Sequence, residues 1–208
     1  MRRDIAELDI ILQGFIDQRR QSGEDRGDLL SMLLAAQDDD GSGMTDKQLR
    51  DELMTIFLAG HETTAMNLSW TWYLLSQHPE AVAKLKTEVD SVLGERRATM
   101  ADLAHLPYTE MVIKEALRLY PPAPGVGREP LEDVQIGGYT LPKGALINIS
   151  VYAMHRNPAY FPNPEVFDPE RFSAEREKDI PRYAYLPFGA GPRVCIGNSF
   201  ALMEARLI

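Results

Sequence analysis

One uninterrupted run of helix-compatible residues, from about 45 to 77, sets the scale of what this chain can fold into. Thr45 followed by Gln48 matches a capping box at the start of the run. Pro79 ends the run because proline cannot continue a helix. A helix of this length would measure about 50 Å, at ~1.5 Å per residue, and would cross a whole domain. The sequence therefore predicts a mainly α-helical fold built around one long helix.

Shorter helices are expected on both sides of this run. Apolar residues at helical spacing predict an amphipathic helix at the start of the chain and a short helix near residues 28–37. Pro79 suits the first turn of a further helix, which should stop at Gly94. The stretch LPYTEMVIKEALRLYPP, residues 106–122, predicts another helix that two prolines close, and a last helix should begin after Cys195.

A small β region interrupts the helical pattern. Within residues 134–151, VQIGGYTL and ALINISV predict two short strands around the turn PKG, the only β segment expected. Residues 156–187 lack periodicity and are rich in proline, asparagine, aspartate and aromatic residues. We expect an ordered meandering loop there, because its aromatic side chains need burial. Those aromatic residues are Tyr160, Phe161, Phe167, Phe172, Tyr183 and Tyr185.

Composition narrows the classes of function. A chain of 208 residues with 44% hydrophobic residues can build the core of one domain. The net charge of −9 argues against a nucleic-acid binder, since phosphate binding needs a basic surface. The single cysteine cannot form an internal disulfide, which fits a reduced cytoplasm. No run approaches the roughly 20 apolar residues that span a bilayer, so we expect no membrane span.

That single cysteine lies in FGAGPRVCIG, residues 188–197, amid three glycines and directly before a predicted helix. A lone cysteine is most often a small buried apolar residue. Here the glycines allow close backbone approach, and the helix start favours a thiolate, which needs a cation or metal as partner. Zinc would need about four ligands, and the sequence has no second cysteine and no closely spaced histidine pair. A single-thiolate centre, haem iron, fits better.

The loop pattern F-x-x-G-x-R-x-C-x-G, formed by Phe188, Gly191, Arg193, Cys195 and Gly197, resembles the haem-binding signature of the cytochrome P-450 family. The resemblance implies a partial cytochrome P-450 fold and haem b as cofactor. It also implies that Cys195 is the axial thiolate ligand of the haem iron and that Phe188 packs near the thiolate. Arg193 would pair with a haem propionate, and both glycines would belong to the cofactor-binding loop.

The segment AGHETT, in the middle of the long run, is similar to the oxygen-binding segment of the same family. Its plain alternative is a packing glycine with polar residues on an exposed helical face. Gly60 costs ~1 kcal/mol relative to alanine inside a helix, and adjacent threonines can distort the helix and open a groove beside the glycine. The resemblance implies that Gly60 leaves space for dioxygen, and that Glu62 and Thr63 supply protons during catalysis. His61 is a poor candidate for a ligand.

Glu115 and Arg118, in KEALR, lie three residues apart and so share a helical face. The plain alternative is a surface ion pair of almost no energetic value. The segment resembles the E-x-x-R helix of the family, whose pair is joined by an arginine of a later P-E-R-F segment, here Arg171. The resemblance implies a buried triad that is structural and not catalytic.

The loop PPAPGVGREPLED leads into the β region. By resemblance, Ala123, Pro124 and Val126 would line an apolar part of the substrate pocket. Arg128 would approach a haem propionate, which its planar guanidinium suits. His155, in HRNP, is a further candidate for contact with the cofactor.

The resemblance extends over residues 1–208 as a single partial domain, the C-terminal half of a cytochrome P-450 domain truncated at both ends. It implies a haem-thiolate monooxygenase that inserts one atom of dioxygen into a small, apolar organic substrate. Electrons would come from NAD(P)H through a separate ferredoxin, flavodoxin or reductase. Two alternatives stay open: a truncated, non-catalytic fragment or haem-binding relic, and a peroxygenase or isomerase variant, against which the Glu62–Thr63 pair argues.

Overall fold

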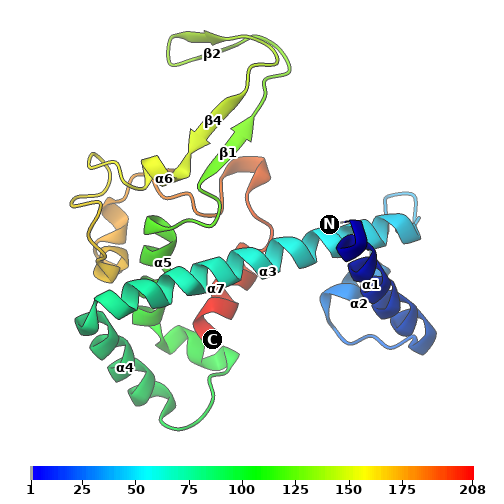
Figure 1. Ribbon diagram of the computed structural model, residues 1–208, viewed down its shortest axis with the longest axis horizontal. Coiled ribbons are helices and arrows are strands. Elements are labelled where there is room, and N and C mark those ends of the chain that lie inside the picture. Colours follow the sequence, from blue (N-terminus) through cyan, green and yellow to red (C-terminus); the bar gives the residue numbers. More distant parts are fainter. Residues whose placement is uncertain (1) are drawn as a thin grey trace. The chain divides into compact units, whose positions relative to one another are not determined.

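The computed structural model describes residues 2–208, and the chain divides into two compact units, one ending at Glu62 and the other comprising Thr63–Ile208. Helices predominate, as predicted (Figure 1). In chain order they are α1 (Arg2–Ser22), α2 (Leu29–Ala35), α3 (Asp46–Gln77), α4 (Pro79–Leu93), α5 (Pro107–Leu119), α6 (Val151–Met154) and α7 (Asn198–Leu207). Short 3-10 turns are η1 (Met100–His105), η2 (Pro169–Phe172), η3 (Glu177–Asp179) and η4 (Gly191–Arg193).

Helix α3 has the predicted ends. The Thr45 hydroxyl accepts a hydrogen bond from the amide of Gln48 at 3.3 Å, and the Gln48 side chain accepts one from the Thr45 amide at 2.9 Å. Pro79 occupies the first turn of α4. The α-helix continues through Gly60 without interruption. No helix in the described part of the chain is long and apolar enough to cross a membrane.

The first unit is organised by the apolar face of α1. Leu12 and Ile16 are buried there, as is Leu49 of α3. Arg19 at the end of α1 pairs with Asp28, the residue that caps the N-terminus of α2 by accepting from the Ser31 amide. The Arg19 guanidinium holds the pKa of the Asp28 carboxyl well below its usual range.

The β region differs from the prediction. Strand β1 (Gly125–Arg128) pairs antiparallel with β4 (Ile147–Ser150), and β2 (Val134–Ile136) pairs antiparallel with β3 (Tyr139–Leu141). The first predicted strand is thus itself a hairpin, because Gly137 and Gly138 adopt φ of 57° and 85° and form its two-residue turn. The second predicted strand is β4, whose partner β1 was not expected. In Figure 1 the β2–β3 hairpin projects beyond the β1–β4 pair.

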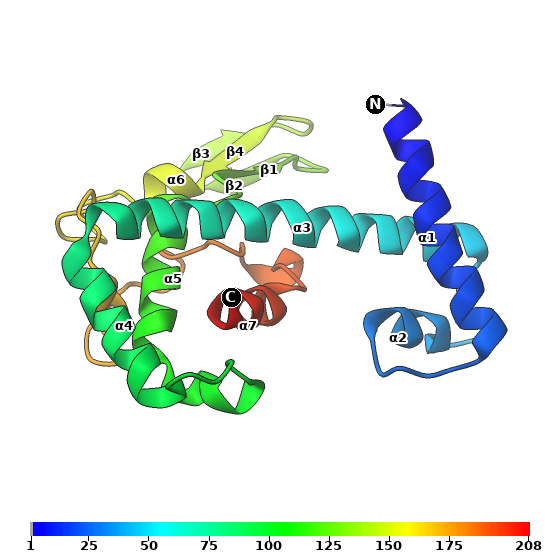
Figure 2. The ribbon, with the colours of Figure 1, turned by 60° about the horizontal axis from the view of Figure 1, so that its bottom comes forward.

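Helix α5 is the centre of the second unit, with α4 and α7 packed against it (Figure 2). One side of α5 belongs to a cluster formed by Leu74, Leu75, Ala81, Val112, Ala116, Leu119 and Phe167. Another side belongs to a cluster formed by Ile113, Leu117 and Ala205, with Leu68, Phe188 and Leu202 packed against it. The second cluster joins α5 to the helix that follows the cysteine loop.

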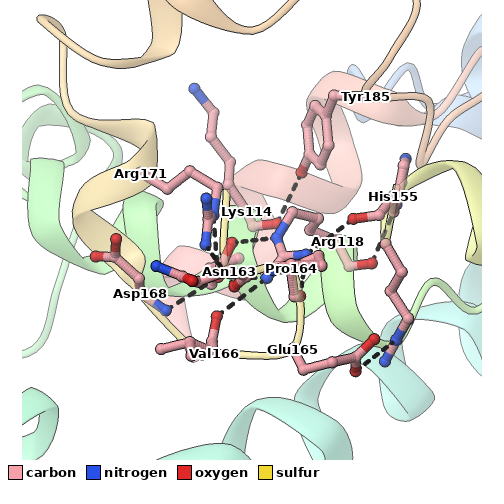
Figure 3. Close-up of polar contacts among 12 residues, drawn as sticks. Lys114, Arg118, His155, Asn163, Pro164, Glu165, Val166, Asp168, Arg171 and Tyr185 are labelled. Carbon is pink, nitrogen blue, oxygen red and sulfur yellow. Dashed lines mark hydrogen bonds and ion pairs between the residues drawn. The ribbon is translucent and has the colours of Figure 1, made fainter. Parts of the chain in front are cut away.

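The predicted triad forms between α5, which carries Glu115 and Arg118, and η2, which carries Arg171, and it is buried. Figure 3 shows Arg118 and Arg171 beside the meander. Glu115 and Arg118 are both 0% exposed, and their two hydrogen bonds, Nε to Oε2 and Nη2 to Oε1, each measure 2.7 Å. Arg171 Nε lies 3.4 Å from Glu115 Oε1. This burial excludes the alternative of a solvent-exposed ion pair.

The triad also binds the backbone of the meander. Arg118 donates to the carbonyls of His155, Pro164 and Val166 at 2.9, 2.7 and 3.2 Å. Arg171 donates to the carbonyls of Pro162 and Asn163 at 2.9 and 3.4 Å, and Glu115 accepts from the amide of Asp168 at 3.0 Å. A loop without regular structure has few backbone partners of its own, so these side chains supply them.

Phenylalanine and tyrosine side chains of the meander differ in burial. Phe161, Phe167 and Phe172 are buried, as expected. Tyr160 and Tyr183 expose 40% and 54% of their surface, against the expectation. Phenylalanine has no polar atom to satisfy, whereas a tyrosine hydroxyl can remain in water while the ring packs.

Replacing Arg171 by leucine is expected to lower the free energy of unfolding by about 3 kcal/mol, because Glu115 loses a cationic partner and two backbone carbonyls lose their donor. Arg176→Leu is the matched control, since its ion pair with Asp168 is largely exposed and should contribute less than about 1 kcal/mol. Urea unfolding of the full chain measures both. Equal losses in the two variants would contradict a stabilising triad.

Candidate cofactor site

The cysteine loop is closed by backbone hydrogen bonds. The amide of Cys195 donates to the carbonyl of Phe188 at 2.9 Å, and the amide of Gly189 donates to the carbonyl of Leu186 at 3.1 Å. Gly189 and Gly191 both have φ of 70°, a conformation that residues with side chains rarely adopt. The loop therefore needs glycine at these two positions, and it presents the Cys195 thiol on the surface.

The thiol lies beside the start of α7. Gly197 caps this helix, and a Cβ placed on Gly197 would lie 3.9 Å from Cys195 Sγ. The sulfur is therefore close to the first turn, where free amides and the helix dipole favour negative charge. Phe188 packs against Ile113, Leu117 and Ala205, which fixes the other end of the loop on α5 and α7.

The surroundings of Cys195 suit a large apolar ligand held by one sulfur atom. Three apolar residues close to Cys195 in the chain are exposed. Val194 and Ile196, on either side of the cysteine, and Phe200 of α7 expose 47%, 99% and 63% of their surface. Exposed apolar residues in such density mark a binding surface. Among the described residues, no group of three or more histidine, cysteine, aspartate or glutamate side chains could hold a metal ion by itself. The donor set therefore fits haem, whose ring supplies the remaining iron ligands, and does not fit zinc.

Two arginines predicted to reach the haem propionates are free to do so. Arg193 is exposed in the cysteine loop and has no ion-pair partner among residues 2–208. Arg128 is exposed in β1, and its guanidinium donates to the carbonyl of its neighbour Gly127 at 2.7 Å. Their contact with a propionate stays a prediction.

His155 does not have the position that the resemblance implied. It is 0% exposed, its Nδ1 lies 3.1 Å from the carbonyl of Arg118, and its Nε2 accepts a hydrogen bond from the Leu186 amide at 2.8 Å. Both ring nitrogens are thus occupied by backbone groups. A role in cofactor binding is wrong for this residue, because no nitrogen is left for a propionate.

The predicted catalytic residues lie on α3. A Cβ on Gly60 would meet no atom within 4 Å, so the space beside this glycine is open in its unit. Glu62 and Thr63 are exposed. His61 stacks on Phe57, one turn earlier, with ring centroids 6.1 Å apart.

The predicted substrate-lining residues lie at the start of β1. Ala123 and Pro124 are exposed and Val126 is half-buried. The carbonyl of Pro124 accepts from the amide of Tyr152 at 3.0 Å, which ties this segment to α6. The segment is thus held in place while its side chains remain accessible.

The sequence did not predict a second polar network, which joins α5 to α7 and η3. Lys114 of α5 pairs with Glu110 and Glu177, each at 3.0 Å, and Glu110 also pairs with Arg206 of α7 at 2.5 Å. The hydroxyl of Tyr185 donates to the carbonyl of Lys114 at 2.9 Å, and burial raises the pKa of Tyr185 well above its ordinary value. Except for the i, i+4 pair on α5, these partners are far apart in the chain, so no local pattern signals them.

Comparison with known proteins gives one consistent result. The family model described as Cytochrome P450 matches residues 1–208. Cyclooctatin synthase of Streptomyces melanosporofaciens is 48% identical over 205 residues, which cover 98% of this chain and 45% of that protein. Cytochrome P450 4V2 of Homo sapiens is 46% identical over 181 residues, which cover 86% of this chain and 34% of that protein. The chain therefore spans less than half the length of these relatives.

Solved structures agree with the sequence comparison. The cytochrome P450DA heme domain superposes with a TM-score of 0.92 at 39% identity, covering 98% of this chain and 46% of that one. Retinoic acid-bound cyanobacterial CYP120A1 superposes with a TM-score of 0.92 at 36% identity, covering 99% of this chain and 48% of that one. With the cysteine loop, the buried triad and the match over residues 1–208, the chain belongs to the cytochrome P450 family.

Proposed function

We propose that the protein containing this chain is a haem-thiolate monooxygenase. The observation that carries the proposal is the exposed Cys195 thiol, presented by a glycine loop at the start of α7 in a chain of this family. Haem held by a cysteine thiolate supplies the chemistry by which one atom of dioxygen enters a C–H bond and the other leaves as water, with two electrons and two protons consumed.

Different residues of this chain would bind different parts of the haem. Cys195 would hold the iron, and Arg193 and Arg128 would pair with the propionates, since a planar guanidinium matches a carboxylate. The sulfur is kept in place by the Cys195–Phe188 backbone bond and by the packing of Phe188 on α5 and α7. Because the Cys195 side chain is already held in place, it would lose little conformational freedom on binding iron, which favours a defined geometry.

Proton supply is proposed for two neighbouring residues of α3. Glu62 and Thr63 are both exposed, so the Glu62 carboxyl group can exchange protons with solvent, and the Thr63 hydroxyl would pass a proton to the reaction site. Gly60, less than one turn earlier, has open space where a side chain would otherwise stand. These residues thus offer room for dioxygen beside a proton donor, on the same helix.

An apolar organic substrate is proposed. The accessible side chains of Ala123, Pro124 and Val126 offer only hydrocarbon contacts. One relative, 45% identical over 204 residues, is named cyclooctat-9-en-7-ol 5-monooxygenase, and one similar solved structure is described as bound to retinoic acid. Both names refer to molecules dominated by hydrocarbon, which supports the proposal.

A separate electron donor is also proposed. The two electrons would come from NAD(P)H through a ferredoxin, a flavodoxin or a reductase. The single cysteine needs no oxidising compartment, so a cytoplasmic location is part of the same proposal.

Cys195→Ala is expected to abolish the thiolate-type Soret shift in a carbon monoxide difference spectrum of the reduced, haem-loaded protein, because no other thiol exists in this chain. Ser199→Ala, in the first turn of α7, is the control and should keep the shift. A shift that survives in Cys195→Ala would remove the basis of the proposed function.

Thr63→Ala is expected to lower the product formed per dioxygen consumed by about tenfold or more, since the hydroxyl that passes the proton is gone. Thr55→Ala is the matched control, because its hydroxyl lies on the same helix and donates to the Asp51 carbonyl. Parallel measurements of oxygen uptake and product decide the matter: unchanged coupling in Thr63→Ala counts against the proton role.

A further inference from the structure

His155 joins helix α5 to the entrance of the cysteine loop. Its Nδ1 donates to the carbonyl of Arg118 at 3.1 Å, and its Nε2 accepts from the amide of Leu186 at 2.8 Å. A carbonyl can only accept and an amide can only donate, so these two partners define a neutral imidazole with its proton on Nδ1. The ring therefore bridges two backbone segments, and it can do so only while it is neutral.

The bridge continues to the cysteine through the loop backbone. The carbonyl of Leu186 accepts from the amide of Gly189, and the carbonyl of Phe188 accepts from the amide of Cys195. Leu186 is thus a point at which a hydrogen bond to a side chain ties the loop to the rest of the second unit. Loss of this tie would leave the loop held by its own backbone hydrogen bonds and by the packing of Phe188.

The imidazole has no room to turn away. Its ring stacks on Tyr185, with centroids 5.2 Å apart and an interplanar angle of 26°, and meets Phe161 edge-on at 6.2 Å. Its own backbone is held at both ends, since the His155 amide donates to Val151 and the His155 carbonyl accepts from Arg118 (Figure 3). A fully buried ring held on all sides can set the position of what it binds.

We propose that His155 is a positioning residue for the cysteine ligand: its neutral imidazole ties Leu186 to the end of α5, and protonation of the ring releases the cysteine loop. The consequence for the iron ligand rests on the proposed function. The tie itself is a property of this chain and does not.

The charges around the ring keep it neutral. On α5, Arg118 carries a positive charge beside it, and the negative charge of Glu115 is already shared between Arg118 and Arg171. Arg156 adds a second positive charge from the next residue. Tyr185 stacks its ring on the imidazole and brings no charge, because burial raises the pKa of its hydroxyl well above the ordinary value. Burial, followed by these positive charges, lowers the pKa of His155 to about 4.

The sign of the pH effect follows from this shift. An unfolded or opened segment exposes a histidine of ordinary pKa near 6.5, which takes up a proton before the buried one does. The closed loop is therefore fully stable above pH ~6.5, and its stability falls as the pH is lowered from about 6.5 to about 4. Near pH 5 the population of the opened loop should have risen by about tenfold or more relative to pH 7.

Two substitutions separate the tie from simple packing. Glutamine at position 155 can place an acceptor where Nε2 stands, whereas asparagine reaches only the place of Nδ1. Hydrogen exchange of peptides covering residues 186–195 in the full chain, corrected for intrinsic exchange rates, reports the tie without haem. At pH 7, His155→Asn should lose about tenfold or more of the protection, and His155→Gln should retain it. His105→Gln, at an exposed histidine of η1, is the control and should match wild type.

The pH profile gives the second measurement. Between pH 7 and 5 the protection of residues 186–195 should fall in wild type and in His105→Gln, and should stay level in His155→Gln. Parallel profiles in wild type and His155→Gln would overturn the proposal, and so would equal protection in the Asn and Gln variants. If His155→Asn does not fold, the comparison of wild type with His155→Gln still decides.

A carbon monoxide spectrum tests whether the His155–Leu186 hydrogen bond affects Cys195 as the iron ligand. At equal haem content, the thiolate-type fraction of the carbon monoxide spectrum should be lower in His155→Asn than in His155→Gln. Equal fractions would overturn the positioning role. Absence of any thiolate-type band in wild type, with the exchange results as expected, would instead refute the proposed function and leave the tie intact.

Discussion

The buried ion pair between Glu115 and Arg118 is the interaction on which the second unit depends. Both side chains are fully removed from solvent, and burying two charges is costly unless every remaining donor and acceptor finds a partner. Here the meander supplies those partners, with three carbonyls for Arg118 and one amide for Glu115. The ion pair and the meander depend on each other, because an irregular loop has no regular backbone hydrogen bonds of its own. The pair therefore stabilises the segment from which the cysteine loop emerges.

Helix α5 supports the cysteine loop at both of its ends. At its C-terminal end, the Arg118 carbonyl holds His155 and, through it, Leu186 at the start of the loop. At its N-terminal end, Glu110 pairs with Arg206 of α7, the helix that follows the loop. The apolar contact of Phe188 with the α5–α7 cluster lies between these two polar links. A thiol on an exposed loop is thus placed by a rigid helix and not by the loop alone.

The sequence predicted what local signals encode. The ends of α3, α4 and α5 followed from a capping box, from prolines and from Gly94, and the triad followed from a spacing that resembles a known helix. Strand β1 was missed because two of its four residues are glycine, which weakens any strand pattern, and the turn at Gly137 was taken for the middle of a strand. The role of His155 was wrong because its partner Leu186 lies 31 residues away in a segment without periodicity. Contacts of that kind arise from tertiary packing, which local patterns do not report.

The central claim is that Cys195 in this loop is the iron ligand of a bound haem. X-ray absorption at the iron edge of the haem-loaded full chain tests it most directly, because sulfur scatters differently from the nitrogen and oxygen atoms that could otherwise fill the axial position. We expect one iron–sulfur shell in wild type, and its loss in Cys195→Ala. A spectrum of wild type that shows only nitrogen and oxygen shells would contradict the account.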